Sequence, residues 1–388
     1  MCTDVSLKGI DGLVLILLCS AYLFPVSSQA ALFSGQVTAL TIYSKDSRQH
    51  RGTTELGRLR LEFGHQKGPL SLKLVYDHEW LWGAAVRDPI FPVLSEAPDP
   101  TWLELSDTID QTAALFWRHN LYRGWIRYEQ DNIRFTAGRQ RLAWGSGRIW
   151  NPTDRFNPVQ PTALEPDQKT GVDALAMNWF YSDVGSLAGV LAPGKSRRGL
   201  ARKTALRWQD TVGEFDLSIL GARVGQEDAL GLDLTGNLGQ ATIRFESLFS
   251  DGGGLTGYSQ WIAGVDATWY PVMLPNGLYL AAELFYNDDP TVSSNALSLL
   301  NQSSDRLQSH TNYQLGFLAG YDLTPLWRLE ALTIFDLEHP SWFVAPSLKW
   351  SWMENIDLTF SSRLFGGQSI GEFASQSAVY LVNIEAYL

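Results

Sequence analysis

Apolar and polar residues alternate with a period of two along most of the chain. In the segment 355–365, Ile356 and Leu358 fall on one face, whereas Asp357 and Arg363 fall on the other. Successive side chains of a β-strand point to opposite faces, so this pattern predicts a strand with one apolar and one polar face.

The same alternation recurs in other segments. In 241–250, Arg244 and Glu246 lie opposite phenylalanines, and in 277–287 Glu283 lies opposite leucines. A soluble β-sandwich also alternates, with its apolar face turned to a core, so alternation alone does not place the chain in a membrane.

Strand number and connection lengths carry the argument further. Combined with turn signals, the pattern predicts 18 strands: 35–43, 57–66, 70–78, 119–129, 132–141, 172–181, 186–192, 201–209, 213–223, 228–235, 240–249, 258–270, 277–287, 311–321, 326–337, 342–352, 355–365 and 375–388. Every second connection is short, and the other set includes long ones at 79–118, 142–171 and 288–310.

This asymmetry is typical of a transmembrane antiparallel β-barrel in a bacterial outer membrane, with short periplasmic turns and long extracellular loops. We therefore predict an all-β barrel of about 18 strands with both termini in the periplasm. Sixteen strands is the alternative, because strand boundaries drawn from one sequence are uncertain by several residues.

The first thirty residues differ from the rest. An apolar run, 12–26, precedes Ser28 and Ala30, which match the small residues of a signal-peptidase site. We expect residues 1–30 to be a cleaved signal peptide and 31–388 to form the barrel. The run is shorter than the roughly 20 residues of a spanning helix, which argues against the alternative of a membrane anchor.

Composition excludes several classes of protein. The formal net charge of −11 argues against nucleic acid as a partner. Both cysteines, Cys2 and Cys19, lie in the predicted signal peptide, so a disulfide scaffold and a thiolate metal site are excluded from the mature chain. The six histidines have no metal-ligand spacing, and we expect neither metal nor cofactor. The 15 Trp, 14 Tyr and 18 Phe suit a barrel with aromatic girdles at both membrane interfaces.

The C-terminal strand adds a resemblance. Its alternating residues, which end on Leu388, are similar to the terminal signal by which outer-membrane barrels reach the barrel assembly machinery: Tyr380, Val382, Ile384, Ala386 and Leu388. The sequence departs from that pattern at Leu388, where phenylalanine is usual. We expect outer-membrane lipid and this machinery as partners.

One connection carries candidate chemistry. Gly138-Arg139-Gln140 followed by Trp144-Gly145 resembles a motif of porin-like and alginate-export-like outer-membrane families. Pro152 and Pro158 prevent an ordinary strand here. We predict that the 142–171 loop folds inward and narrows the lumen, with these constriction candidates: Arg139, Arg141, Trp144, Arg148, Asn151, Asp154, Arg155 and Asn157.

The alternative is that the arginines of this loop only pair with nearby carboxylates and tie it down. Strict alternation would also point Arg139 into lipid, so we expect either a bulge at Gly138 or a position of Arg139 at the outer interface. The charged strand residues are candidates to face the lumen: Arg127, Glu129, Arg134, Arg244, Glu246, Glu283, Asp357 and Arg363.

These features favour a passive or weakly selective channel for small solutes or an exported polymer. The alternative is a closed barrel that acts as a surface receptor or envelope polysaccharide assembly factor, with its binding surface in the loops 79–118 and 288–310. The first of these loops is rich in large apolar residues, including Trp80, Trp82, Phe91 and Trp102. A barrel hydrolase is the third reading, but nothing in the sequence places a serine beside a histidine and a carboxylate, and we expect no enzyme.

Overall fold

The computed structural model describes residues 32–45, 49–89, 91–95, 101–158, 160–166, 168–169, 171–196, 199–200, 202–254, 257–290, 307 and 309–388. The predicted signal peptide lies outside these described residues.

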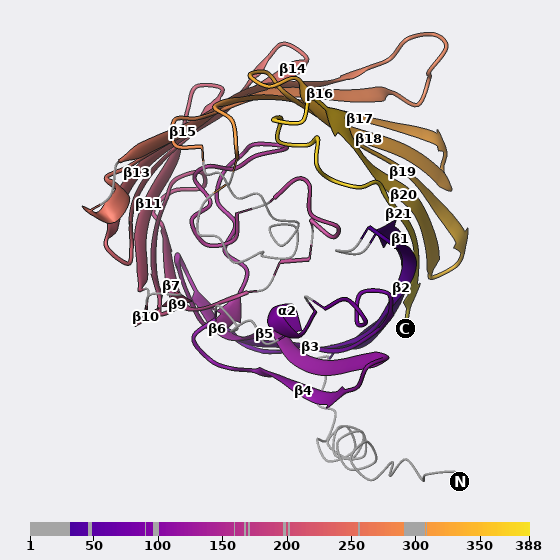
Figure 1. Ribbon diagram of the computed structural model, residues 1–388. Helices are drawn as coiled ribbons and strands as arrows, with labels where there is room; N and C mark the ends of the chain where they lie inside the picture. The colour runs from indigo at the N-terminus through magenta and orange to yellow at the C-terminus, as the bar shows by residue number, and fades with distance from the viewer. Residues whose placement is uncertain are drawn as a thin grey trace.

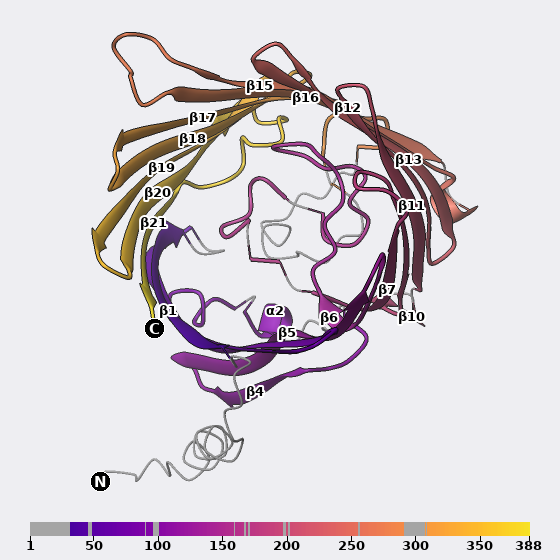
Figure 2. The same cartoon turned by 180° about the vertical axis from the view of Figure 1, so that it is seen from behind.

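Within the described residues, eighteen antiparallel strands close into a single barrel (Figures 1 and 2). They are β1 (Leu32–Lys45), β2 (Arg51–Lys67), β3 (Leu70–Gly83), β5 (Leu115–Gln130), β6 (Ile133–Gln140), β7 (Val172–Phe180), β8 (Ser186–Ala192), β11 (Lys203–Val212), β12 (Phe215–Val224), β13 (Glu227–Leu238), β14 (Ala241–Ser250), β15 (Tyr258–Trp269), β16 (Leu278–Asn287), β17 (Tyr313–Thr324), β18 (Trp327–Asp336), β19 (Ser341–Met353), β20 (Ile356–Gly367) and β21 (Val379–Tyr387). Each overlaps one predicted strand, so the prediction of 18 strands is confirmed.

The barrel closes where the last strand pairs with the first. The β1–β21 ladder runs from Gln36↔Tyr387 to Tyr43↔Tyr380. Beyond it, the Leu388 amide donates to the Gly35 carbonyl at 2.8 Å. Closure leaves no open sheet edge among the barrel strands. A sheet exposed to lipid requires this closure, because lipid chains cannot hydrogen-bond to unpaired backbone groups.

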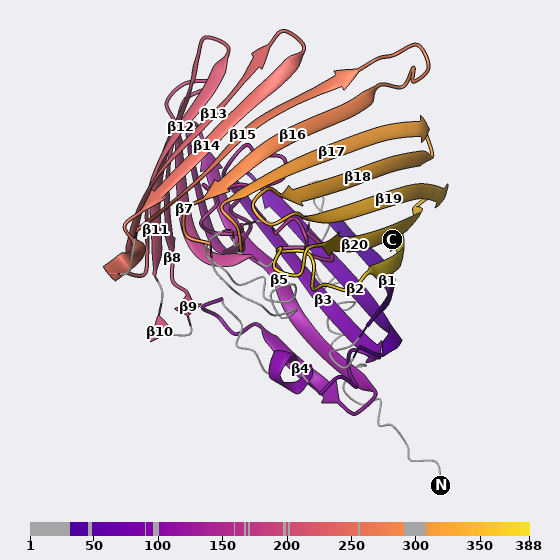
Figure 3. The same ribbon diagram turned by 45° about the horizontal axis from the view of Figure 1, so that its top comes forward.

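Short elements decorate one end of the barrel (Figure 3). They are α2 (Phe91–Ser95), β4 (Ser106–Gln111), β9 (Lys195–Ser196), β10 (Gly199–Leu200) and the 3-10 turn η1 (Gly252–Gly254). β4 pairs with residues 116–120 of β5, beyond the end of β6. No helix within the described residues is long and apolar enough to cross a membrane.

The loop predicted at 79–118 is shorter than expected. β3 continues to Gly83 and β5 begins at Leu115, because aromatic residues extend the alternation past His78. Trp80 and Trp82 therefore belong to a strand. Within the remaining loop, Phe91 is buried against Val86 and Phe116, whereas Trp102 is exposed.

The apolar face of each strand turns outward. On β14, Phe245 and Phe249 are exposed, whereas Glu246 between them is fully buried on the inner side. A polar inner face and an apolar outer face are the reverse of a soluble sandwich, and they are what a barrel in a bilayer requires.

Folded loops occupy much of the lumen. One inner cluster joins Ile149 and Trp150 of the β6–β7 connection to Leu307, to Phe373 of the β20–β21 connection and to Phe285 of the wall. The Trp150 and Phe285 rings stack with their centroids 5.3 Å apart. The inner wall therefore serves as the packing surface for the loops that shape the passage.

Candidate constriction site

The connection between β6 and β7, residues 141–171, turns into the barrel instead of outward. Figures 1 and 2 show it in magenta inside the ring of strands. Its contacts lie on two separate parts of the wall. The first part comprises β11 and β13 to β16, and the second comprises β2, β5 and β20.

A single carboxylate holds the first turn of the loop. Glu246 of β14 accepts hydrogen bonds from four described loop atoms: the amides of Ser146 (2.7 Å), Gly147 (2.7 Å) and Thr153 (3.1 Å) and the Thr153 hydroxyl (2.7 Å). The Glu246 side chain is fully buried. Buried amides outside regular structure need such acceptors, so Glu246 fixes the path of the backbone here.

A second carboxylate holds the loop backbone in the same way, two strands further along the wall. Glu283 of β16 accepts from the backbone amides of Arg148, Ile149 (2.8 Å) and Trp150 (3.2 Å). Residues 146–153 are thus bound through their backbone, which leaves the Arg148 side chain directed to the lumen and 45% exposed.

Cationic groups gather between the two anchors. Arg244 pairs with Asp266 at 2.7 Å and donates to the Ser146 carbonyl at 3.0 Å. The same Asp266 carboxylate meets Arg148 at 3.4 Å. Two guanidinium groups thus share one carboxylate between the anchors Glu246 and Glu283, so charges of both signs meet at this point of the lumen.

The far end of the loop reaches the opposite wall. Arg58 of β2 holds Glu165 through two hydrogen bonds of 2.9 Å and also contacts Glu79 of β3 at 2.8 Å. Arg60 of the same strand pairs with Asp77 at 2.7 Å and donates to Gln168 at 3.0 Å. A forked guanidinium suits such bidentate contacts, so these arginines fix the direction of the loop as well as its position.

Further contacts complete the second attachment. Arg123 of β5 donates to the carbonyl of Lys169, whose ammonium donates to the Pro158 carbonyl. Arg363 of β20 lies 3.5 Å from the Leu164 carbonyl. The loop is therefore attached to both sides of the lumen and crosses it.

Several candidate residues hold the loop in shape. Arg155 is 1% exposed and contacts Glu227 at 2.9 Å, and it also donates to the Tyr258 hydroxyl. Asp154 accepts from the amides of Phe156 (3.0 Å) and Asn157 (2.8 Å), and burial raises its pKa to about 6 although these donors oppose the shift.

The remaining loop candidates lie around this framework. Asn157 accepts from the Leu142 amide at 3.2 Å, and Asn151 donates to the Gly147 carbonyl at 3.2 Å. Trp144 packs edge-on against Phe156, with ring centroids 5.1 Å apart, and the Arg207 guanidinium lies 5.9 Å from its ring. Arg141 is exposed, and among the described residues it makes no ion pair.

Arg139 lies at the loop end of β6, one residue before the strand ends. Its fully shielded guanidinium contacts Asp173 at 3.0 Å, the Thr101 hydroxyl at 2.6 Å and the Leu103 and Leu121 carbonyls. Segment 101–105 covers it at the end of the barrel wall, so it is screened from both lipid and lumen.

Gly138 does not form a bulge. The β5–β6 and β6–β7 registers continue through it without a shift. Gly138 instead has a φ of +117°, and a Cβ there would lie 2.2 Å from the Gly124 carbonyl oxygen. Only glycine accepts this conformation without strain.

The other strand candidates lie nearer the short turns or beside the loop. Glu129 pairs with Arg134 at 2.7 Å, and Asp357 pairs with Lys349 at 2.8 Å. Arg127 donates to the Thr136 hydroxyl at 3.2 Å and lies over the Trp125 ring. None of these described contacts involves the 141–171 loop.

Sequence reasoning missed some attachment residues. Arg58, Arg60, Asp77 and Asp266 were not among the candidates, although the first two alternate with leucines in β2 as inward residues should. In the described parts of the chain, no group of three or more His, Cys, Asp or Glu side chains could hold a metal ion.

No protein-family model matches the chain, and no curated protein does. Solved structures do match. Acinetobacter baumannii OccAB1 aligns with a TM-score of 0.58 at 8% identity, over 94% of this chain and 97% of that one. A BenF-like porin from Pseudomonas fluorescens Pf-5 gives 0.56 at 9%, and Pseudomonas aeruginosa OccK8 (OprE) gives 0.55 at 10%, each over 92% of this chain and 98% of the other.

The fold is that of an 18-stranded porin. At such low identity the likeness concerns the fold alone. It supports the porin part of the resemblance read from the sequence and gives no support to the alginate-export part.

Proposed function

We propose that the chain is a channel of the bacterial outer membrane that lets small solutes pass, and that the 141–171 loop sets the width of its lumen. The observation that carries this proposal is the double attachment of the loop. Backbone amides bind Glu246 and Glu283 on one side, and Glu165 binds Arg58 on the other.

This attachment favours small solutes over an exported polymer. A polymer needs a wide and continuous path, whereas a loop tied to both walls divides the lumen. Exposed side chains such as those of Arg141 and Arg148 then meet whatever passes, and charged groups at a narrow point set selectivity. A weakly selective channel needs neither a cofactor nor catalytic residues.

The receptor alternative gains little support from the described surface. Of the aromatic residues expected to line a binding loop, Trp80 and Trp82 lie in β3, and Phe91 is buried. Barrel insertion by the assembly machinery remains part of the proposal, on the pattern of the C-terminal strand from Tyr380 to Leu388.

Single-channel conductance in planar bilayers tests the proposal. The mature chain is compared with a variant that lacks Ser146 to Gln168, and a heat-modifiable band on gels establishes that both barrels are folded. Discrete conductance that rises on deletion supports a channel narrowed by the loop. Two folded barrels without conductance would refute the channel function.

A further inference from the structure

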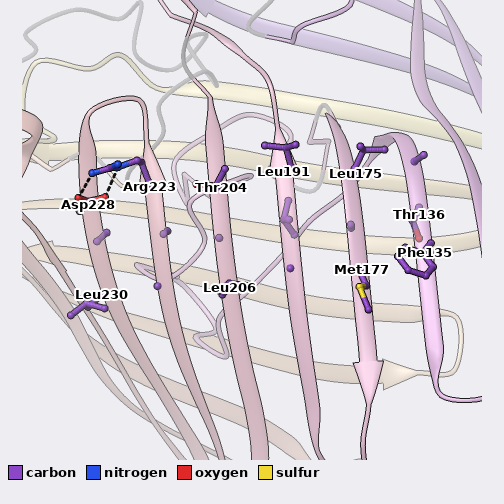
Figure 4. A pocket seen from close by; sticks show the side chains of 18 of the residues that line it. Phe135, Thr136, Leu175, Met177, Leu191, Thr204, Leu206, Arg223, Asp228 and Leu230 are labelled. Carbon is purple, nitrogen blue, oxygen red and sulfur yellow. Dashed lines mark hydrogen bonds and ion pairs between the residues drawn. The ribbon is translucent and has the colours of Figure 1, made fainter.

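The outer wall of the barrel carries an apolar groove of about 1260 Å³. It extends over the outward face from β5 to β14 (Figure 4). Small-molecule pockets occupy roughly 300–1,000 Å³, so this groove is large enough for an extended hydrocarbon chain.

Two glycines in one row of paired residues create the groove. The row runs from Tyr128 to Phe249 across the strands, and in it Gly189 pairs with Leu206, which pairs with Gly221. Directly paired residues of an antiparallel sheet lie on the same face. The missing side chains leave hollows on either side of Leu206, and a Cβ at Gly221 would meet nothing within 4 Å.

The next row toward the loop end gives the groove a polar mouth. In that row Leu191 pairs with Thr204, Thr204 pairs with Arg223, and Arg223 pairs with Asp228. Arg223 and Asp228 form an exposed ion pair at 2.7 Å, as the dashed lines in Figure 4 mark. The groove thus runs from charged groups at the extracellular end into the apolar belt, as a lipid does from its head to its chains.

An apolar hollow inside a bilayer does not stay empty or hold water, since its walls would lose dispersion contacts and a water there would lack polar partners. A second copy of the barrel is a poor occupant. A stable interface needs about 800 Å² of matched surface on each partner, and a convex barrel wall cannot enter a groove. A flexible hydrocarbon chain can enter it, and the groove is continuous with the surface that faces lipid.

We propose that this groove binds one acyl chain of a phospholipid of the surrounding bilayer, with the lipid head group at the Arg223–Asp228 pair. Gly189 and Gly221 then leave space for the acyl chain, since neither has a positive φ that would require glycine for the backbone. This inference does not depend on solute passage. Conductance tests the proposed channel and lipid retention tests the groove, so either proposal can be refuted without the other.

Native mass spectrometry of the full barrel tests the proposal, with the barrel extracted from vesicles of phosphatidylethanolamine and phosphatidylglycerol. Gly221→Trp fills the groove, and Gly189→Leu is a second filling variant. Leu280→Trp is the matched control, because Leu280 is an exposed outward residue of β16 on another part of the wall. Heat modifiability establishes that each variant is folded.

We expect wild type and Leu280→Trp to retain the same bound lipid. The filling variants should bind it roughly tenfold or more weakly, because excluding even two methylenes costs about that factor. Equal retention by all four proteins would overturn the proposal. A disulfide-linked dimer of a Leu206→Cys variant in the membrane would also overturn it, because a second copy would then occupy the groove.

Discussion

Replacing Glu246 by alanine should release the first attachment of the lumen loop without unfolding the barrel. The change leaves four described donors without an acceptor: three backbone amides and the Thr153 hydroxyl. Hydrogen bonds contribute about 0.5–3 kcal/mol each, with the larger values for a charged acceptor, which sets an upper bound of roughly 12 kcal/mol for the four.

The loop can recover part of this free energy by moving into water. Even a loss of about 3 kcal/mol of docking free energy raises the ratio of undocked to docked loops more than 100-fold. The eighteen-strand ladder does not involve this side chain, so the barrel should stay folded. We therefore expect Glu246→Ala to conduct more in each open event, with larger current fluctuations.

Glu330→Ala is the matched control for conductance. Glu330 also faces inward, and its pairing with Arg328 at 2.8 Å does not involve the loop. Each variant removes one carboxyl group from the inner wall, so an effect of charge alone would appear in both. Protease accessibility of residues 145–153 reports loop release directly. If Glu246→Ala matches wild type in conductance and in proteolysis, the assignment of Glu246 as the anchor is wrong.

Three further changes test other parts of the structure. Glu283→Ala removes the acceptor of three described loop amides and should raise conductance as well, which single-channel recording would detect. Gly138→Ala should destabilise the barrel by about 1–3 kcal/mol because of its positive φ, whereas Gly221→Ala should be nearly neutral, and urea unfolding compares the two. Burial raises the pKa of Glu372 to about 7, so the folded state binds more protons than the unfolded state between about pH 4.5 and 7. Docking of the 368–378 loop should therefore weaken as the pH rises through this window, so limited proteolysis should cut the loop faster at pH 8 than at pH 5. In the Glu372→Gln variant this difference between the two pH values should disappear.

The sequence alone determined the strands and their number. Alternation is a local property, because each side chain faces inward or outward according to its position in its own strand. The pattern therefore placed Arg244, Glu246 and Glu283 on the polar face, and the short turns separated neighbouring strands. Boundaries were less certain where aromatic residues prolonged the pattern, as at the end of β3.

The tertiary structure decided the path of the loop. Ser146 and Glu246 lie 100 residues apart in the chain, and no local pattern says which carboxylate will meet which amide. The sequence marked Arg139 as a constriction candidate and Glu246 only as a lumen residue. In the folded protein their places differ: Arg139 is enclosed beneath segment 101–105, whereas Glu246 holds the loop. The alternation of side chains follows from the backbone geometry of each strand, but the pairing of buried donors with acceptors is settled only when the closed barrel brings distant strands and loops together.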